Sequence, residues 1–161
     1  MREDGHGVIA TDLGPWEIRW TERGLSGFRP MEAPPALPPE APGWVREAAA
    51  RLARHLDGEP QDLADLPLDL SGLTPFQRAV AEALRRTRAG QLTYGDLAAL
   101  AGRPGAARAV GRALRDNPML VLIPCHRVVA ASSEGGWSAF GSPEVKRRLR
   151  ALDEGDMDQR A

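Results

Sequence analysis

The chain contains a single cysteine, Cys125, which follows an apolar run and a proline and precedes a histidine and an arginine. The run, residues 119–123, suits a buried strand or a tightly packed inner loop. Pro124 has a fixed φ and no N–H, so it ends the run and stiffens the next turn. Any fold must therefore bury this stretch and still hold the thiol rigidly. A lone cysteine is most often an inert, buried residue. Because a charged pair follows at once, a second interpretation is that His126 takes up the thiol proton and leaves a nucleophilic thiolate.

The composition excludes several classes of protein. A chain of 161 residues is long enough for one sizeable core or two small lobes. No apolar run is long enough to span a bilayer, and the acidic, polar first residues do not resemble a secretory signal. One cysteine cannot form an internal disulfide, and with three histidines it gives no recognisable zinc spacing. We therefore expect a cytoplasmic protein with no membrane partner, no metal and no cofactor.

The formal net charge of −1 hides a strong asymmetry along the chain. Residues 1–74 hold 7 basic and 13 acidic residues, whereas residues 75–150 hold 13 basic and 5 acidic residues. A segment as basic as the second is typical of proteins that bind a polyanion such as nucleic acid. A solvated, arginine-rich surface would give the same count, so both interpretations stay open at this point.

The first 73 residues predict a small α/β lobe, with a small antiparallel sheet and a helix, that braces the rest of the chain. Turn signals separate segments of strand type, and one segment has the apolar period of a helix. The predicted strands are residues 8–11, 16–20, 24–28 and 66–70, and the predicted helix is residues 44–56. No residue of this lobe suggests chemistry.

Residues 74–155 predict a second, mostly helical lobe, followed by a polar tail at 156–161. Thr74 and Pro75 are typical of the N-cap and the first position of a helix. The helix that they open has an apolar stripe on one face and arginines outside it, which indicates that one side is buried.

A helix-turn-helix signature lies inside this second lobe. Thr93 begins a sequence that resembles a capping box, and Leu97 and Leu100 in the helix that follows are expected to face inward. A glycine-containing turn at 102–105 then leads to a helix from about residue 106 to 116. The alternative is an ordinary helical hairpin.

The second helix of this pair has an unusually bare surface. Ala107 and the other small residues leave few long polar side chains to read bases in the major groove, so close approach along a backbone or in a shallow groove is favoured. Arg108, Arg112 and Arg115 lie on one face at i, i+4 and i+7. We expect two of them to hold phosphates. Arg108 is expected to enter the base stack, where a flat guanidinium stacks and donates hydrogen bonds.

Asn117 and Pro118 end this helix and lead into the cysteine stretch. An asparagine here can hydrogen-bond backbone groups on both sides, which would tie the helix to the loop that holds the thiol. A simple Asn-Pro turn is the alternative.

Four runs of the second lobe together resemble the O6-alkylguanine-DNA alkyltransferases. These runs are residues 93–98, 107–111, 117–118 and 123–128. The resemblance covers about residues 74–153, and it implies a winged-helix-like DNA-binding lobe. The first half of the chain resembles the variable N-terminal lobe of that family only in length and strand order.

The resemblance also implies an activity, the direct and irreversible repair of O6-alkylguanine in DNA. Cys125 would accept the alkyl group by in-line attack, and His126 would activate the thiol through a water. Tyr94 would donate its hydroxyl to the departing base and so reduce the charge that develops on the purine. Arg108 would fill the gap that the flipped nucleotide leaves. The implied partner is double-stranded DNA bound through the minor groove by a monomer.

The implied substrate pocket differs from the family pattern. Val128 and the loop residues Trp137, Ser138 and Ala139 would line this pocket. The loop is one residue longer than the usual Gly-x-Tyr-x-Gly-Gly pattern, and Trp137 stands where a tyrosine is usual. The width of the pocket and the range of adducts therefore stay open.

The resemblance implies a carboxylate on the last helix that orients His126, and two candidates are adjacent. Asp153 and Glu154 differ by about 100° around a helix, so only one can face His126. We favour Asp153, because it shares its side of the helix with Val145, Leu149 and Leu152. Lys146 on the same helix either assists or is a solvated charge.

Three other functions remain open. An alkyltransferase-like protein that binds lesions without repairing them would normally lack the cysteine. A helix-turn-helix regulator with an inert cysteine would bind an operator sequence regardless of alkylation. A cysteine hydrolase is the weakest alternative, because its histidine normally comes from a distant part of the chain.

Overall fold

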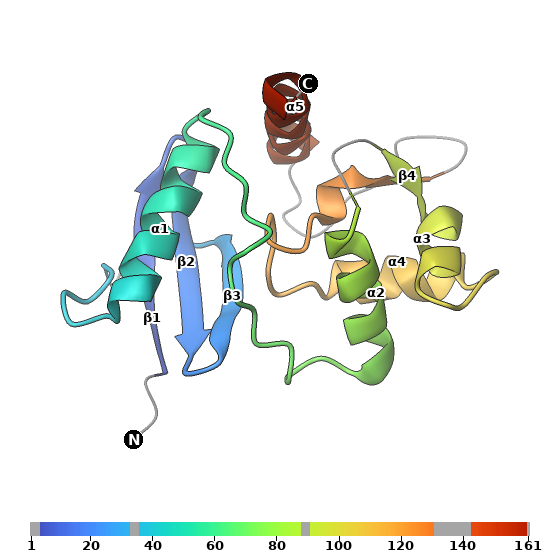
Figure 1. The fold of residues 1–161 in the computed structure, drawn as a ribbon, viewed down its shortest axis with the longest axis horizontal. Helices are drawn as coiled ribbons and strands as arrows, with labels where there is room; N and C mark the ends of the chain where they lie inside the picture. The colour runs from blue at the N-terminus through green and yellow to red at the C-terminus, as the bar shows by residue number, and fades with distance from the viewer. Residues whose placement is uncertain (1–3, 33–35, 88–90, 131–142, 161) are drawn as a thin grey trace. The chain divides into compact units, whose positions relative to one another are not determined.

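The computed structural model describes residues 4–32, 36–87, 91–130 and 143–160, with the side chains of the last segment described over 144–153. The chain divides into two compact units, Met1–Gly72 and Leu73–Ala161 (Figure 1). The sequence placed a boundary between residues 73 and 74, one residue from this division. We describe each unit separately.

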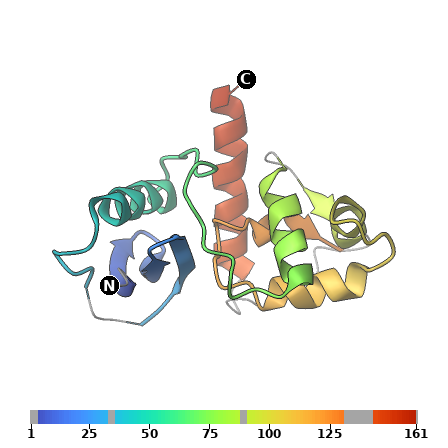
Figure 2. The same ribbon diagram turned by 60° about the horizontal axis from the view of Figure 1, so that its bottom comes forward.

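The first unit is a three-stranded antiparallel sheet with one helix. Its strands follow one another in the order β1-β2-β3, and the helix lies along one face of the sheet (Figure 2). The elements are β1 (Gly5–Thr11), β2 (Gly14–Thr21), β3 (Gly24–Pro30) and α1 (Gly43–Leu56). This architecture confirms the predicted α/β lobe. Alternation along β2 places Trp16, Ile18 and Trp20 in the core.

The other face of the sheet carries a buried carboxylate. Glu17 in β2 is only 3 % exposed. Its Oε1 accepts from the Nε atoms of Arg19 at 3.0 Å and Arg29 at 3.4 Å. The two arginines thus pair the charge of the buried carboxylate.

The segment 66–70, predicted as a strand, forms only an isolated bridge to β3. Leu25 N donates to Pro67 O and Leu25 O accepts from Asp69 N, both at 2.8 Å. Pro67 has no N–H with which to continue a ladder. The Asp69 carboxylate also accepts from the Thr21 hydroxyl at 2.7 Å, so side-chain bonds replace a ladder here.

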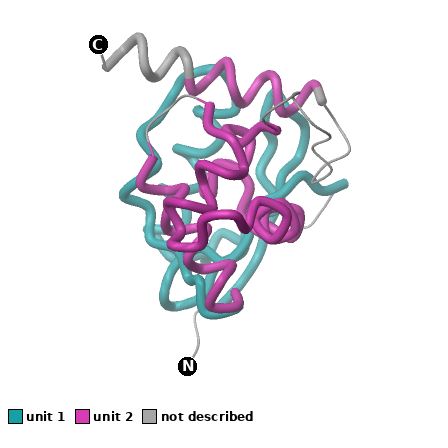
Figure 3. The backbone as a smooth tube through the Cα atoms, turned by 90° about the vertical axis from the view of Figure 1, so that its right-hand side faces the viewer, with its two compact units in different colours: residues 1–72 teal, residues 73–161 magenta. Residues whose placement is uncertain are grey.

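The second unit is mostly helical, as predicted, and is drawn in magenta in Figure 3. Three helices pack on one another, and a two-stranded parallel sheet joins them to a short 3₁₀ helix. Its elements are α2 (Pro75–Arg85), β4 (Leu92–Thr93), α3 (Tyr94–Leu100), α4 (Ala107–Arg115), η1 (Cys125–Arg127), β5 (Val128–Val129) and α5 (Pro143–Arg160). The predicted polar tail therefore continues α5 as far as Arg160. No helix of the described residues is long and apolar enough to cross a membrane.

Capping boxes begin two of the helices. Thr93 caps α3, and its hydroxyl accepts from Asp96 N at 3.0 Å while the Asp96 carboxylate accepts from Thr93 N at 3.0 Å. One expectation for α3 is wrong, because Leu100 is 56 % exposed. It is the last residue of a seven-residue helix, and Leu97 and Ala98 supply the buried contacts instead.

The apolar run before the cysteine forms a tightly packed inner loop. Ile123 N donates to Met119 O at 2.8 Å, and Leu122 N donates to Leu120 O at 2.7 Å, so the chain folds back on itself. Val121 adopts a φ of 71°, which is rare for a β-branched residue. The loop is buried throughout, so its packing maintains this strained backbone.

Candidate active site

A short parallel pairing brings two distant segments of the second unit together. Leu92 pairs with Val128 and Thr93 pairs with Val129. The 3₁₀ helix η1 ends directly before Val128, and α3 begins directly after Thr93. The pairing therefore places Tyr94, the first residue of α3, close to the cysteine and histidine of η1.

Cys125 is the first residue of η1 and is 1 % exposed. Its N–H donates to Ile123 O at 2.7 Å, so the loop holds the backbone of the cysteine. The side chain of Asn117 donates from Nδ2 to the same Ile123 oxygen at 3.0 Å, and its Oδ1 accepts from Met119 N at 2.9 Å. Asn117 thus ties the end of α4 to both ends of this loop, which is more than a simple turn requires.

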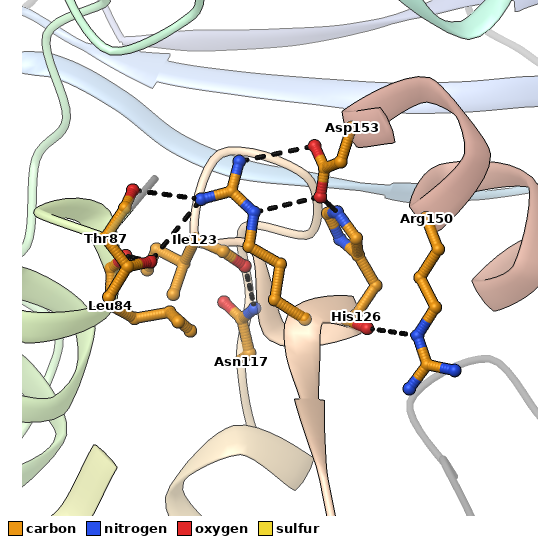
Figure 4. A network of polar contacts seen from close by, with 8 residues as sticks. Leu84, Thr87, Asn117, Ile123, His126, Arg150 and Asp153 are labelled. Carbon is orange, nitrogen blue, oxygen red and sulfur yellow. Dashed lines mark hydrogen bonds and ion pairs between the residues drawn. The ribbon is translucent and has the colours of Figure 1, made fainter. Parts of the chain in front are cut away.

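The buried imidazole of His126 lies against a carboxylate of α5 (Figure 4). Its Nε2 is 2.6 Å from Oδ2 of Asp153. Arg127 binds the same carboxylate with two nitrogens, Nε to Oδ2 at 2.9 Å and Nη2 to Oδ1 at 3.2 Å. Its Nη1 donates to Thr87 O at 3.1 Å, just beyond the end of α2. The contacts of Arg127 thus connect α2, η1 and α5.

These contacts set the charges of the pair. Burial alone would raise the pKa of Asp153, but hydrogen bonds from His126 and Arg127 outweigh it and hold the pKa well below its usual range. Burial lowers the pKa of His126, and it outweighs the opposing effect of the adjacent Asp153. Asp153 is therefore ionised and His126 neutral near pH 7.

The protonation of the pair identifies the nitrogen of His126 that is free to accept a proton. An ionised Asp153 can only accept, so the imidazole proton lies on Nε2. Nδ1 then carries a lone pair, and this buried atom has no hydrogen-bond partner within the described part of the chain. His126 Nδ1 is thus the atom that can accept a proton, and Asp153 stabilises the imidazolium that results.

Tyr94 lies between α4 and the cysteine. A methyl group placed on Gly111 of α4 would be 3.9 Å from Cε1 of the Tyr94 ring. Burial raises the pKa of Tyr94, the nearby Cys125 raises it further, and the positive charges of Arg150 and Arg115 lower it. The phenol is therefore protonated near pH 7 and can donate a hydrogen bond.

One face of α5 lies against this site. Lys146, Leu149 and Asp153, at i, i+3 and i+7, are buried. Lys146 Nζ donates to Val128 O at 3.5 Å, so the alternative of a solvated charge is wrong for this residue. Val128 is itself fully buried. The side chain of Glu154, the other candidate carboxylate, lies outside the described residues.

The three arginines of α4 lie on its exposed face. Arg108, Arg112 and Arg115 are all exposed, whereas Val110 and Leu114 on the other side of the helix are buried. Ala107, at the start of the helix, is half-buried. This arrangement gives α4 a cationic face with few other long side chains.

Some predicted residues are not described, and others were not predicted. Trp137, Ser138 and Ala139 lie outside the described residues. The described residues contain no group of three or more His, Cys, Asp or Glu side chains that could hold a metal ion. From the sequence, Arg127 was noted only as part of the charged pair that follows the cysteine, and Arg150 was not singled out. The spacing from Lys146 through Arg150 to Asp153, at i, i+4 and i+7, was the available signal.

Comparison with known proteins agrees with this geometry. Residues 75–155, half of the chain, match the family model described as "6-O-methylguanine DNA methyltransferase, DNA binding domain". The chain belongs to this family. The match spans α2, α3, α4, η1 and most of α5, so the second unit carries the DNA-binding domain of a 6-O-methylguanine DNA methyltransferase.

Relatives match the chain well beyond this domain. A methylated-DNA--protein-cysteine methyltransferase of Mus musculus is 35% identical over 91% of this chain and 79% of its own length. One of Mycobacterium leprae is 41% identical over 81% of this chain and 72% of its own length. The crystal structure of Mycobacterium tuberculosis OGT in complex with DNA has a TM-score of 0.75 and 32% identity, and the match covers 93% of each chain.

Proposed function

We propose that this protein repairs O6-alkylguanine in double-stranded DNA by transferring the alkyl group irreversibly to Cys125. The observation that carries the proposal is the pairing of His126 with Asp153 beside this cysteine. It leaves His126 Nδ1 able to accept the thiol proton, directly or through a water. Membership of the 6-O-methylguanine DNA methyltransferase family supports the same chemistry.

The proposed transfer is a single displacement. The thiol proton moves to His126, and the Cys125 sulfur attacks the alkyl carbon in line with the bond to O6. A carbon–sulfur bond forms, the carbon–oxygen bond breaks, and the electron pair goes to the purine. Tyr94 donates a hydrogen bond or its proton to the departing base, which limits the charge on it. A thioether is a poor leaving group, so each molecule acts once.

The burial of Cys125 requires that the target base leave the duplex. A stacked base cannot reach a sulfur that is 1 % exposed, whereas a flipped nucleotide can enter a pocket. The bare α4 suits the shallow minor groove, with Arg112 and Arg115 on phosphates and Arg108 in the gap left by the base. The protein would act as a monomer in the cytoplasm.

A mass measurement tests the proposal. Incubation with duplex DNA containing O6-methylguanine should add one methyl group to Cys125, and unmethylated DNA should add none. The Cys125→Ser variant should bind the lesion and accept no methyl group. If the wild type binds the lesion but Cys125 gains no methyl group, the protein is instead an alkyltransferase-like protein that binds lesions without repairing them. Preference for one DNA sequence regardless of alkylation would support a regulator.

A further inference from the structure

Arg150 lies in the active site, although the proposed transfer assigns it no role. It extends from α5, and its Nε donates to the carbonyl oxygen of His126 at 2.9 Å (Figure 4). His126 is adjacent to Cys125 in η1, so this bond fixes the backbone next to the cysteine. Arg150 is half-buried, which places a permanent positive charge where solvent screens it only in part.

The charge of Arg150 acts on the groups that flank the sulfur. It lowers the pKa of His126, together with burial and Arg127 and against Asp153. Burial and the charge of Cys125 raise the pKa of Tyr94, and the charges of Arg150 and Arg115 partly oppose this rise. Arg115 is an exposed residue of the cationic face of α4, whereas Arg150 comes from the opposite element, α5.

We propose that Arg150 is a positioning residue for alkyl transfer: it anchors η1 through the His126 carbonyl and holds a fixed positive charge beside Cys125 and Tyr94. The inference rests on the proposed function for its kinetic consequence. Its structural part, the position of the charge set by the bond from Arg150 Nε to the His126 carbonyl, stands independently of any reaction.

Arg150 acts on the negative charge that moves through the site during the transfer. The negative charge begins on sulfur, passes to the purine as the carbon–oxygen bond breaks, and passes to the Tyr94 oxygen if the phenol gives up its proton. His126 holds the thiol proton and returns it, through solvent, to the phenolate. A cation beside the sulfur and the phenol favours the anion on either, and it disfavours a second positive charge on His126 before the thiol is deprotonated.

The sign of the effect follows from these charges. Arg150→Leu removes a positive charge, so the pKa of His126 and the pKa of Tyr94 both rise. Neutral His126 is the form that accepts the thiol proton, and protonated Tyr94 is the form that donates. Both limbs of the pH–rate profile should therefore move to higher pH, and the transfer rate at neutral pH should fall by about 3- to 10-fold.

Two variants isolate the charge. Arg150→Lys keeps the charge and loses the Nε geometry, so it should restore most of the wild-type pH profile. Arg148→Leu removes the same charge from an exposed position of α5 and should leave the profile unchanged. Slower transfer by Arg150→Leu with an unshifted profile would show that Arg150 only stabilises the fold, and the proposal would be wrong.

A titration tests the placement of the charge without any substrate. Tyr94 is the only tyrosine of the chain, so the ultraviolet absorbance of tyrosinate reports this side chain alone. The titration midpoint of Tyr94 should rise in Arg150→Leu, and in Arg148→Leu it should match the wild type. Circular dichroism at each pH verifies that the proteins remain folded. An unchanged midpoint in a folded Arg150→Leu variant would overturn the inference, even if the wild type proved to be a repair protein. A raised midpoint in a protein that transfers no alkyl group would retain the placement and reject the proposed function.

Discussion

Nε2 of His126 lies 2.6 Å from Oδ2 of Asp153, and the same carboxylate oxygen is 2.9 Å from Nε of Arg127. Asp153 therefore has two tasks at once. It fixes the tautomer of the imidazole, and it neutralises a guanidinium that also binds the end of α2. Because Arg127 helps to keep this carboxylate ionised, the basicity of His126 Nδ1 depends in part on the contact between Arg127 and Asp153.

The first prediction concerns this carboxylate. Asp153→Asn preserves the size of the side chain but allows its amide to donate to Nε2, which moves the imidazole proton to Nδ1 and removes the base. The rate of methyl transfer to Cys125, measured by rapid quench in a single turnover, should fall by on the order of 10²- to 10⁴-fold. DNA binding should persist, because Asp153 lies away from the exposed face of α4.

The matched control for Asp153 is Glu144→Gln. Glu144 is an exposed carboxylate in the first turn of the same helix. This variant loses the same charge and should transfer at the wild-type rate. If Asp153→Asn also retained a rate within about tenfold of the wild type, its role in orienting His126 would be rejected.

The second prediction concerns acid stability. The pKa of His126 in the folded protein lies below the ordinary value of about 6.5, so the unfolded chain takes up this proton first as the pH falls. The stability that neutral His126 contributes is present above about pH 6.5 and is lost toward its folded pKa. Asp153, with its depressed pKa, adds a second loss that begins below about pH 4.

Guanidinium unfolding at a series of pH values measures both stages. The wild type should lose free energy of unfolding below about pH 6.5 relative to His126→Gln, which has no proton to take up at this position. Plotted against pH, the free energies of unfolding of the two proteins should run in parallel above about pH 7. Parallel curves over the whole range would show that burial does not disfavour the charged imidazole.

Much of the architecture could be predicted because local signals coincide with tertiary contacts. Thr93 with Asp96 is such a signal, since the capping box needs only two residues three positions apart. The segment 66–70 was mistaken for a strand because alternation alone cannot show that Pro67 and Asp69 divert its hydrogen bonds. Leu100 was misplaced because a helical period does not reveal where a short helix ends.

The active site was harder to predict where it depends on contacts between distant residues. Cys125 and His126 are adjacent, so the sequence alone showed that a thiol and an imidazole lie close together. The choice of Asp153 followed from helix geometry, and the structure places that residue 2.6 Å from the imidazole. Arg127 gave no such signal, and Arg150 gave only its helical spacing from Lys146 and Asp153. Each is one arginine among many in a basic segment, and their roles become visible in the contacts of α5 with η1.

The third prediction concerns the glycine beside Tyr94. Gly111 lies in the interior of α4, and a Cβ there would meet the tyrosine ring at an ordinary contact distance of 3.9 Å. Gly111→Ala should raise the free energy of unfolding by about 0.5 to 1 kcal/mol through helix propensity. Gly24→Ala should have the opposite effect, because its φ is +150° and its Cβ would lie 2.7 Å from the backbone of Pro67. Equal destabilisation of both variants would show that Tyr94 has no room to accept the methyl group.

The fourth prediction separates two roles on the cationic face of α4. Arg108→Ala should slow transfer from duplex DNA at saturating concentration, because flipping then costs a few kcal/mol that the intercalated guanidinium no longer offsets. Its reaction with free O6-alkylguanine base should be unchanged, since a free base needs no flipping. Arg112→Ala is the matched control, an exposed arginine one turn along the same face. It should weaken DNA binding and reduce the salt dependence of the affinity by about one counterion, with little effect on the saturated rate. Equal slowing of the duplex and free-base reactions by Arg108→Ala would instead assign Arg108 to the chemistry at Cys125 or to the fold of α4.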